Sequence, residues 1–570
     1  MWASEILTWL DNSPGRFEVA SWGVFALAGA AALGASAWNE RRRWWQSPAV
    51  FAALSLLSIM AFRWPMVLDN RELQDPDESQ IMSGASKLAQ DPFYWKSVDG
   101  DTRGPVNDLP LLVLDKMGIH PDYTGVRFFG AVLAWACVMC AWVVFRHLFG
   151  DAWARILVLP ILGVHAFSDF WNFVQYGSEQ VTDALIALSC ALLVTSFGPP
   201  GRFPNRRRLL FLGIALGLVP FAKLQGAPIA AWIGIYAAWQ IATASAAGPR
   251  VRARCLAALF GGVAAVFAMI LLWVVCGGAW KDFYGSYVLE NLRYAGARWF
   301  SWDQMPSKLY ELSGMAPGSK PYLFWAAALS TLGLAAFLKF SRSNRSHAAF
   351  ALGLAAVAVL AAMAPGRMFP HYLQLTFFPV GLLCGVVTGA SIAFVRQRVR
   401  LQPTTARVLQ GAIVVSFLAF GLGPQINWRR HETQPSLGQF NRTHGRLQRT
   451  AVARAILSHA HSGERLGIWG WGPKFWVQTG LLQATRDGDT SRQMDLNSSR
   501  SSYRDRYMRD LMESRPPVFI DAVGKGNFEF NDRYESGHET FGDLNDFIRV
   551  NYREVGDVDG TRIYVRNDRS

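Results

Sequence analysis

Two neighbouring carboxyl groups, those of Asp77 and Glu78, stand where a helical pattern begins just after a long apolar segment. A carboxylate beside a surface of low dielectric constant can have a raised pKa and act as a general base toward a hydroxyl or an amine. Acidic residues are also common in the first turn of a helix, and this alternative explains the pair equally well. The pattern gives two candidates for proton transfer, with helix capping as the structural alternative.

A second acidic group lies in the segment 176–183, where Glu179 and Asp183 open another apolar stretch. The side chain of Asp183 is expected about one helical turn inside that stretch. An ionisable group in such a position is unfavourable unless it faces a cavity or a partner. The position therefore favours a functional role for Asp183.

Positively charged side chains stand in two short turns, which contain Lys223 and Arg367 with His371, and Arg293 stands in the large loop 277–318. Lys and Arg are unfavoured in short external turns of membrane proteins, so these residues suggest an anionic partner such as a phosphate group. Snorkelling of the long side chains toward lipid headgroups is the alternative, and for Lys223 it is an equally good interpretation.

Metal binding is a further use for the acidic residues. The ten histidines are scattered, so the close spacing that is typical of zinc ligands is absent. Asp77, Glu78 and Asp183 could instead hold a divalent cation such as Mg²⁺ or Mn²⁺ through oxygen atoms. The residues assign no other cofactor.

These candidates belong to a chain whose composition is typical of a membrane protein. Of its 570 residues 51% are hydrophobic and only 17% are charged, and the apolar residues form long blocks. A helix needs roughly 20 apolar residues to cross about 30 Å of hydrocarbon. We expect about twelve spans, at 18–38, 48–67, 124–146, 153–171, 180–197, 208–222, 227–244, 255–276, 320–339, 347–364, 374–395 and 407–424.

The net charge of +14 comes from basic residues that follow alternate spans, so it does not indicate a nucleic acid partner. By the positive-inside rule these basic loops are cytoplasmic. The loop 68–122 and everything after about residue 425 are then expected on the opposite side of the membrane. The basic groups lie at 41–43, 146–155, 202–208, 250–254, 339–345 and 396–407.

The blocks divide the chain into three expected parts. Residues 1–47 form an N-terminal segment with a retained span, and residues 48–424 form the membrane body. The body carries two large external loops, at 68–122 and 277–318. The tail, residues 425–570, contains short strand-like runs and is expected to be a small α/β domain.

The first large loop is expected to contain two short helices. Helical spacing of apolar residues predicts one over 78–90, lying along the membrane surface, and a second over 107–117. All six cysteines fall inside expected spans, so the external loops have no disulfide framework.

The order of these motifs resembles the GT-C superfamily of glycosyltransferases that use polyprenyl-phosphate sugars. The branch with the protein O-mannosyltransferases and the lipid A aminoarabinose transferases is the most similar. The resemblance covers about residues 48–400, and it implies an all-α fold of about twelve transmembrane helices with a C-terminal α/β domain. It rests on Pro76-Asp77-Glu78 at the start of a loop helix, the stretch 104–111, the Glu179/Asp183 loop, the turn 222–226 and the motif 369–373.

The resemblance implies transfer of a sugar from a polyprenyl-phosphate donor to a glycolipid, a cell-envelope polysaccharide or a protein. Inversion of the anomeric carbon in one displacement is expected. Asp77 is implied as the catalytic carboxylate. The acidic set also includes Glu78, Glu179 and Asp183. The set implied to hold the donor and its lipid phosphate is Lys223, Arg293, Arg367, His371 and Tyr372.

The same resemblance implies a monomeric, multi-pass protein of the bacterial inner membrane, surrounded by lipid. The active site and the tail are expected on the periplasmic side. Two features depart from the family. Asn107-Asp108 stands where aminoarabinose transferases have an acidic-basic pair, which argues against lipid A as acceptor, and the span at 18–38 is additional.

Two other classes of membrane protein remain as alternatives. A transporter or flippase for a lipid-linked or anionic substrate would also have many spans with intramembrane charges, although its site is usually near the midplane. An O-antigen ligase or polymerase would use arginine-rich external loops and a diphosphate-linked donor. The early Asp77-Glu78 loop favours the glycosyltransferase.

Overall fold

The structure is a computed structural model, and it describes most of the chain. The described residues are 14–37, 44, 47–118, 121–168, 170–197, 204–244, 247–296, 301, 303–316, 318–398, 402–431, 445–495 and 499–569. Some of the basic residues that mark the expected cytoplasmic loops lie outside these ranges, namely Arg41, Arg42, Arg43, Arg202 and Arg400.

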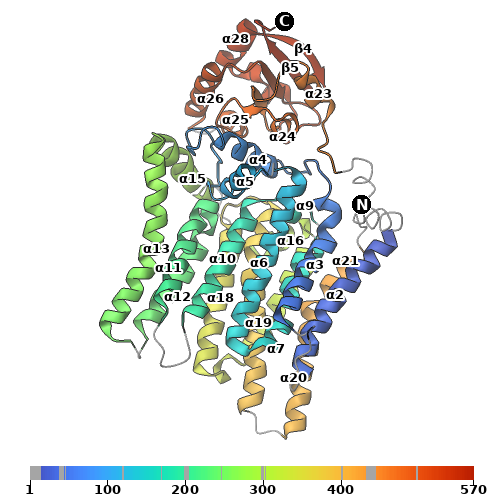
Figure 1. The fold of residues 1–570 in the computed structure, drawn as a ribbon, viewed down its shortest axis with the longest axis vertical. Helices are drawn as coiled ribbons and strands as arrows, with labels where there is room; N and C mark the ends of the chain where they lie inside the picture. Colours follow the sequence, from blue (N-terminus) through green and yellow to red (C-terminus); the bar gives the residue numbers. More distant parts are fainter. Residues whose placement is uncertain are drawn as a thin grey trace. The chain divides into compact units, whose positions relative to one another are not determined.

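Long helices form the membrane body (Figure 1). Every expected apolar block becomes helical, because a helix satisfies its own backbone polar groups where no water is available. The main helices are α2 (Pro14–Ala37), α3 (Pro48–Val67), α6 (Tyr123–Phe149), α7 (Asp151–Leu157), α8 (Leu159–Phe167), α10 (Ser178–Ser196), α11 (Arg206–Ala222), α12 (Ala227–Ala242), α13 (Pro249–Cys276), α17 (Ser319–Leu334), α18 (Arg342–Met363), α19 (Gln374–Arg398) and α20 (Pro403–Gly421). Shorter connecting helices are α9 (Trp171–Val174), η2 (Leu224–Gly226), α15 (Glu290–Gly296), α16 (Met305–Met315), η4 (Phe337–Lys339), η5 (Pro370–Leu373) and α21 (Gly423–His431).

Eight helices in the described part of the chain are long and apolar enough to cross a membrane. The other expected spans correspond to shorter helices, because α11, α12 and α17 have 17, 16 and 16 residues. A multi-pass helical membrane protein is therefore confirmed. The total of twelve spans stays a prediction.

The span expected at 153–171 is divided in two. Helix α7 ends at Leu157, and α8 begins at Leu159 with Pro160 as its second residue. Proline has no backbone N–H, so the hydrogen bonding of a continuous helix is interrupted at this point.

The chain forms two compact units, each assembled from segments that are far apart in the sequence. The first unit comprises Met1–Leu68, Arg127–Met269 and Leu292–Arg442, and contains the packed transmembrane core. The second comprises Asp69–Val126, Ile270–Asn291 and Thr443–Ser570. Most of the first large loop and the tail from Thr443 onward therefore belong to one compact unit.

The tail contains a five-stranded mixed sheet with the order β2-β1-β3-β5-β4. Strand β1 pairs in parallel with β2 and β3, and β5 pairs antiparallel with β3 and β4. The expected α/β character of the tail is confirmed. Its strands are β1 (Arg465–Gly470), β2 (Leu482–Gln483), β3 (Val518–Ala522), β4 (Tyr552–Val558) and β5 (Thr561–Arg566). Its helices are α23 (Ala451–Leu457), α24 (Lys474–Thr479), α25 (Ser491–Met494), α26 (Arg500–Ser514), α27 (Arg533–Ser536), η6 (His538–Thr540) and α28 (Gly542–Asn551).

The first large loop contains both expected helices, α4 (Asp77–Leu88) and α5 (Asp108–Lys116). The position of α4 along the membrane surface stays a prediction. Nearly all of its residues are buried, and it packs against α5, α24 and β2. Gln80 and Lys87 on this helix are hydrogen-bonded to the tail. The second large loop contributes α14 (Trp280–Asp282) and the π-helix η3 (Phe283–Leu289) to the same unit.

Candidate active site

In the first unit, Lys223 and Glu179 form a buried ion pair. Lys223 follows α11 in an extended conformation, which turns its side chain away from the helix path, and Glu179 lies in the first turn of α10. The Lys223 Nζ is also 3.3 Å from Ser178 Oγ. A buried charge is strongly unfavourable unless it is paired, so each member of this pair stabilises the charged form of the other.

Residues of η5 complete the surroundings of this pair. His371 Nε2 lies 3.6 Å from Glu179 Oε1, and the Lys223 Nζ lies 4.8 Å from the centre of the Tyr372 ring. The structure therefore brings together four residues from three separate sequence motifs. The four are Glu179, Lys223, His371 and Tyr372.

The cluster continues to Arg367 through a pair of tyrosines. The hydroxyl groups of Tyr372 and Tyr294 are 2.8 Å apart, and the Arg367 guanidinium lies 5.4 Å from the centre of the Tyr294 ring. Arg293, the neighbour of Tyr294, is exposed. Two cations joined by phenol groups provide several hydrogen-bond donors, which is suitable chemistry for an anion with several oxygen atoms. Tyr294 was not among the residues expected from the sequence.

Asp183 lies one helical turn further along α10, in different surroundings. It lines a small cavity, with about the room that one water molecule needs, together with Arg63, His165 and Gln180. Neither Glu179 nor Lys223 lines this cavity. The functional role of Asp183 stays a prediction, and its surroundings differ from those of the Lys223 pair.

Two groups of side chains in the described residues have the spacing to hold a metal ion. One is Cys137, His165 and Asp183, and the other is Asp521, His538 and Glu539. Mg²⁺ and Mn²⁺ prefer oxygen ligands, whereas these sets contain nitrogen and sulfur. Both sets also contact an arginine: Arg63 lines the cavity of the first, and Arg533 Nη1 lies 3.1 Å from Asp521 in the second.

Because of these nitrogen and sulfur ligands, neither set fits the expected Mg²⁺ or Mn²⁺. The oxygen set that the sequence suggests is divided between the units. Asp77 and Glu78 belong to the second unit, and Asp183 belongs to the first.

In the second unit, Asp77 and Glu78 form the first turn of α4. The capping role belongs to a neighbour, because Asp75 Oδ1 accepts a hydrogen bond from the Asp77 backbone N–H at 2.9 Å. Glu78 is buried, whereas Asp77 is only partly buried. Asp77 and Glu78 therefore occupy the first turn of the helix, where carboxylates are favourable, and the catalytic role of Asp77 stays a prediction.

The loop also holds ionisable residues that the sequence patterns did not indicate. Burial raises the pKa of Glu72 to about 7, and a hydrogen bond from Ser79 at 2.6 Å opposes the shift. Burial likewise raises the pKa of Asp108 to about 7. Both groups therefore exchange protons near neutral pH, unlike ordinary carboxylic acids.

Arg103 is a buried cation of the same loop. Burial lowers its pKa, but the fields of Tyr94, Asp108 and Asp77 outweigh this effect and keep the guanidinium charged. Its Nη1 donates a hydrogen bond of 2.8 Å to Gln80 Oε1. No local motif marks Arg103, and the only signal in the sequence is that it precedes the Gly104-Pro105 stretch.

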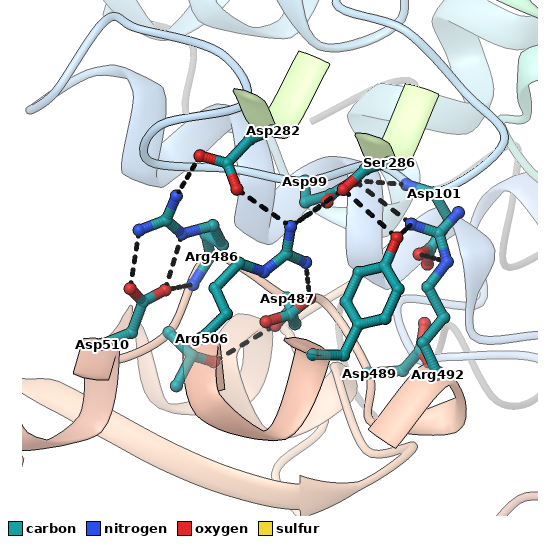
Figure 2. Close-up of polar contacts among 12 residues, drawn as sticks. Asp99, Asp101, Asp282, Ser286, Arg486, Asp487, Asp489, Arg492, Arg506 and Asp510 are labelled. Atoms are coloured by element: carbon teal, nitrogen blue, oxygen red, sulfur yellow. Dashed lines mark hydrogen bonds and ion pairs between the residues drawn. The ribbon is translucent and has the colours of Figure 1, made fainter. Parts of the chain in front are cut away.

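A network of arginine and aspartate residues joins the loop to the tail (Figure 2). Arg506 lies at its centre and contacts Asp487, Asp99 at 2.8 Å and Asp282 at 3.4 Å. Arg486 bridges Asp282 at 2.9 Å and Asp510 at 2.7 Å.

The network contains more aspartates than arginines, and the pKa values of Asp99 and Asp101 are shifted in opposite directions. Burial would raise the pKa of Asp99, but Arg506 and Arg492 lower it to about 2. Burial, supported by Asp489, raises the pKa of Asp101 to about 8 against the attraction of Arg492.

No protein-family model and no curated protein matches this chain. Solved structures do match it. ArnT from Cupriavidus metallidurans bound to undecaprenyl phosphate is similar with a TM-score of 0.55 and 11% sequence identity, over 91% of this chain and 98% of that chain. The apo state of the same protein gives a TM-score of 0.53 over the same shares. This chain therefore shares the fold of ArnT, and that shared fold agrees with the GT-C resemblance found in the sequence motifs.

Proposed function

We propose that this chain is a membrane glycosyltransferase that moves a sugar from a polyprenyl-phosphate donor to an acceptor outside the cytoplasm. The cluster of Lys223, Glu179, His371, Tyr372 and Arg367 carries the proposal, because it gathers cations and phenol groups at the ends of apolar helices. The GT-C fold supports it, since a protein with this fold was solved with undecaprenyl phosphate bound.

The reaction needs a base and a means of holding the leaving phosphate. Asp77 takes the proton from the acceptor hydroxyl, and the acceptor oxygen then bonds to the anomeric carbon of the sugar. The bond between that carbon and the phosphate oxygen breaks, which releases polyprenyl phosphate. Lys223 and Arg367 stabilise the charge that develops on the phosphate. A single displacement of this kind inverts the anomeric carbon.

Mass spectrometry of lipid products tests the proposal. Wild-type protein and the Asp77→Asn variant are reconstituted with a panel of polyprenyl-phosphate sugars and a membrane glycolipid extract. We expect the wild type to consume one donor and to add the mass of its sugar to an acceptor. The Asp77→Asn variant should fold and show no transfer, because an amide cannot accept the proton. Turnover at the wild-type rate by a folded variant would contradict the role of Asp77.

A matched pair of lysine variants tests the phosphate role. Lys223→Met should lower transfer by about 10²-fold or more, because removal of one group that stabilises developing charge typically has this effect. Lys320→Met is the control, since Lys320 also lies over a tyrosine ring, that of Tyr310, at 3.6 Å, outside the cluster. Adding EDTA to the same assay tests for a divalent cation, and restoration by Mg²⁺ or Mn²⁺ would assign one.

The cavity at Asp183 favours one alternative, a transporter. Intramembrane ionisable groups that face a cavity often mark a substrate or proton pathway. Donor movement across a vesicle membrane, with no change in donor mass and with sensitivity to Asp183→Asn, would support the transporter and contradict the transferase.

A further inference from the structure

The small cavity inside the first unit is lined by polar side chains from several membrane helices. Four of them are ionisable and buried, and each comes from a different helix: Arg63 from α3, Cys137 from α6, His165 from α8 and Asp183 from α10. A polar group inside a membrane protein is costly unless it has a partner. Four such groups around one cavity therefore need an explanation in terms of what the cavity holds.

Several polar atoms of these side chains are left without a hydrogen bond. Within the part of the chain that the structure describes, no group pairs with His165 Nε2, Asp183 Oδ1 or Arg63 Nη1, although all three atoms are buried. Buried donors and acceptors are nearly always paired in folded proteins, with protein, water or an ion. The three atoms therefore indicate that the cavity has an occupant.

Three of the side chains have the types and the spacing of a transition-metal site. The ligand atoms of Cys137, His165 and Asp183 all lie within 4.8 Å of one another. In a tetrahedral zinc site, bonds of about 2.0–2.3 Å place the ligand atoms about 3.5 Å apart, so small side-chain rotations bring this set to bonding distance. Sulfur, nitrogen and oxygen together are ligands that Zn²⁺ accepts.

The cavity provides room for a fourth ligand. Zinc sites with three protein ligands complete their coordination with a water molecule, and this cavity has about the room that one water molecule needs. Zinc binds cysteine as the thiolate, so binding releases the proton of the Cys137 thiol. The thiolate and the Asp183 carboxylate then balance the two positive charges of the ion, which suits a site of low dielectric constant.

Arg63 supports this ligand set from outside it. Its Nε donates a hydrogen bond of 2.7 Å to the backbone oxygen of His165, which holds the last turn of α8 in place. Partners that fix the orientation of a ligand-bearing segment are usual around metal sites. The unpaired Nη1 of Arg63 remains as a donor for the water at the fourth position.

We propose that Cys137, His165 and Asp183 bind a Zn²⁺ ion, with a water molecule in the cavity as its fourth ligand. The ion joins α6, α8 and α10 inside the membrane body. Helix α10 also carries Glu179 in its first turn, so the ion fixes the helix that presents the pair with Lys223. The metal site does not depend on the proposed sugar transfer.

Metal analysis of the purified full-length protein tests the proposal without any enzyme assay. Any affinity tag is removed, and the protein is incubated with ZnCl₂ in detergent, washed and analysed by inductively coupled plasma mass spectrometry. We expect one tightly bound zinc ion per chain. X-ray absorption at the zinc edge should show a sulfur ligand at about 2.3 Å. Wild-type protein that retains no zinc would overturn the proposal and leave water as the occupant of the cavity.

Cobalt identifies the sulfur ligand. Co²⁺ takes the place of Zn²⁺, and a bond to a thiolate gives a charge-transfer band in the near ultraviolet. The Cys137→Ser variant should lose this band. Its affinity for Co²⁺ should fall by about 100-fold or more, because loss of only a supporting partner of a ligand already costs about 10–100-fold.

Cys190→Ser is the matched control. Cys190 is as deeply buried as Cys137 and lies on α10, the helix of Asp183, but it is outside the ligand set. This variant should keep both the band and the wild-type affinity for Co²⁺. Equal cobalt binding, with equal bands, in Cys137→Ser and Cys190→Ser would show that the metal binds elsewhere and would overturn the proposal.

A second ligand variant protects the test against misfolding. His165→Gln keeps Cys137 and should also weaken cobalt binding, and size-exclusion elution with thermal unfolding shows whether each variant is folded. If both ligand variants misfold, the zinc content and the sulfur signal of the wild type still decide the result. The set in the tail, Asp521, His538 and Glu539, contains no sulfur, so an ion bound there gives neither the band nor the sulfur distance.

Discussion

Asp108 shows how one buried carboxyl group ties the stability of the loop to pH. It is fully buried, and Tyr94 Oη donates a weak hydrogen bond to it at 3.4 Å. Its pKa of about 7 in the folded protein is above its ordinary value of 3.8. Between these two values the folded state binds more protons than the unfolded state, so the contribution of Asp108 to stability falls as pH rises toward 7.

The Asp108→Asn variant should therefore gain stability relative to the wild type as pH increases. An amide of the same shape carries no charge to bury, so the difference in Tm between variant and wild type should increase by about 3 °C or more from pH 5 to pH 8. Thermal unfolding in detergent by tryptophan fluorescence measures it. Asp543→Asn, at an exposed site on α28, should leave Tm within about 1 °C at each pH. A constant difference for Asp108→Asn would contradict the buried, protonated state.

The candidate residues found from the sequence share one property, which is that their charge conflicts with their apolar surroundings. Glu179, Lys223 and His371 lie at the ends of apolar blocks, so each could be recognised alone, and the structure brings them together. Gln80 and Arg103 could not be recognised in this way. They lie in a polar loop, and their partners depend on a fold that no local pattern encodes.

At the scale of elements, helices α11 and α13 approach each other closely through glycine. A methyl group built on Gly262 would lie 2.3 Å from Leu210 O, and one on Gly213 would lie 2.0 Å from Leu259 O. Small residues at such positions let two backbones come into contact within a membrane. These glycines therefore determine the distance between α13 and α11, the helix that immediately precedes Lys223.

Gly262→Ala should destabilise the protein, because the added methyl group meets backbone atoms that cannot move without separating the helices. Overpacking of this kind typically costs about 1–3 kcal/mol. Gly261→Ala is the control, since a methyl group there meets nothing within 4 Å. We expect a lower Tm for Gly262→Ala alone. Equal values of Tm for the two variants would show that the helices are less closely packed.

Element type was predictable from the sequence to a large extent, since each apolar block became a helix and the loop helices begin close to their expected positions. The break between α7 and α8 was not predicted, although Pro160 provides the physical signal. The buried position of α4 was not predicted either. Its polar face resembles that of a surface helix, and only the distant residues that cover it make the difference.

At the scale of the whole molecule, Arg506 contacts all three segments of the second unit. It contacts Asp99 of the loop, Asp282 of the following segment and Asp487 of the tail (Figure 2). Arg506 is almost completely buried, so its charge and those of its partners depend on one another. Removal of one member of such a group leaves buried charges without compensation.

Arg506→Met should therefore destabilise the second unit by about 3–5 kcal/mol, the usual effect of breaking a buried ion pair. It should also increase cleavage of the loop and the tail by trypsin under native conditions, which gel electrophoresis and mass spectrometry would detect. Arg549→Met, at an exposed site on α28, should change neither property. Wild-type resistance to trypsin in Arg506→Met would show that the network does not hold the segments together.

The second unit is assembled from segments that are far apart in the sequence, and this determines when it can form during synthesis. Gln80 and its partner Asp489 are 409 residues apart, and the ribosome adds about 5–20 residues per second. The first loop is therefore made roughly 20 to 80 s before the residues that hold it exist. Every nascent chain therefore passes through a stage in which its membrane helices are complete but the loop that carries Asp77 lacks its contacts with the tail. The contact between Gln80 and Asp489 forms only as the last quarter of the chain is made.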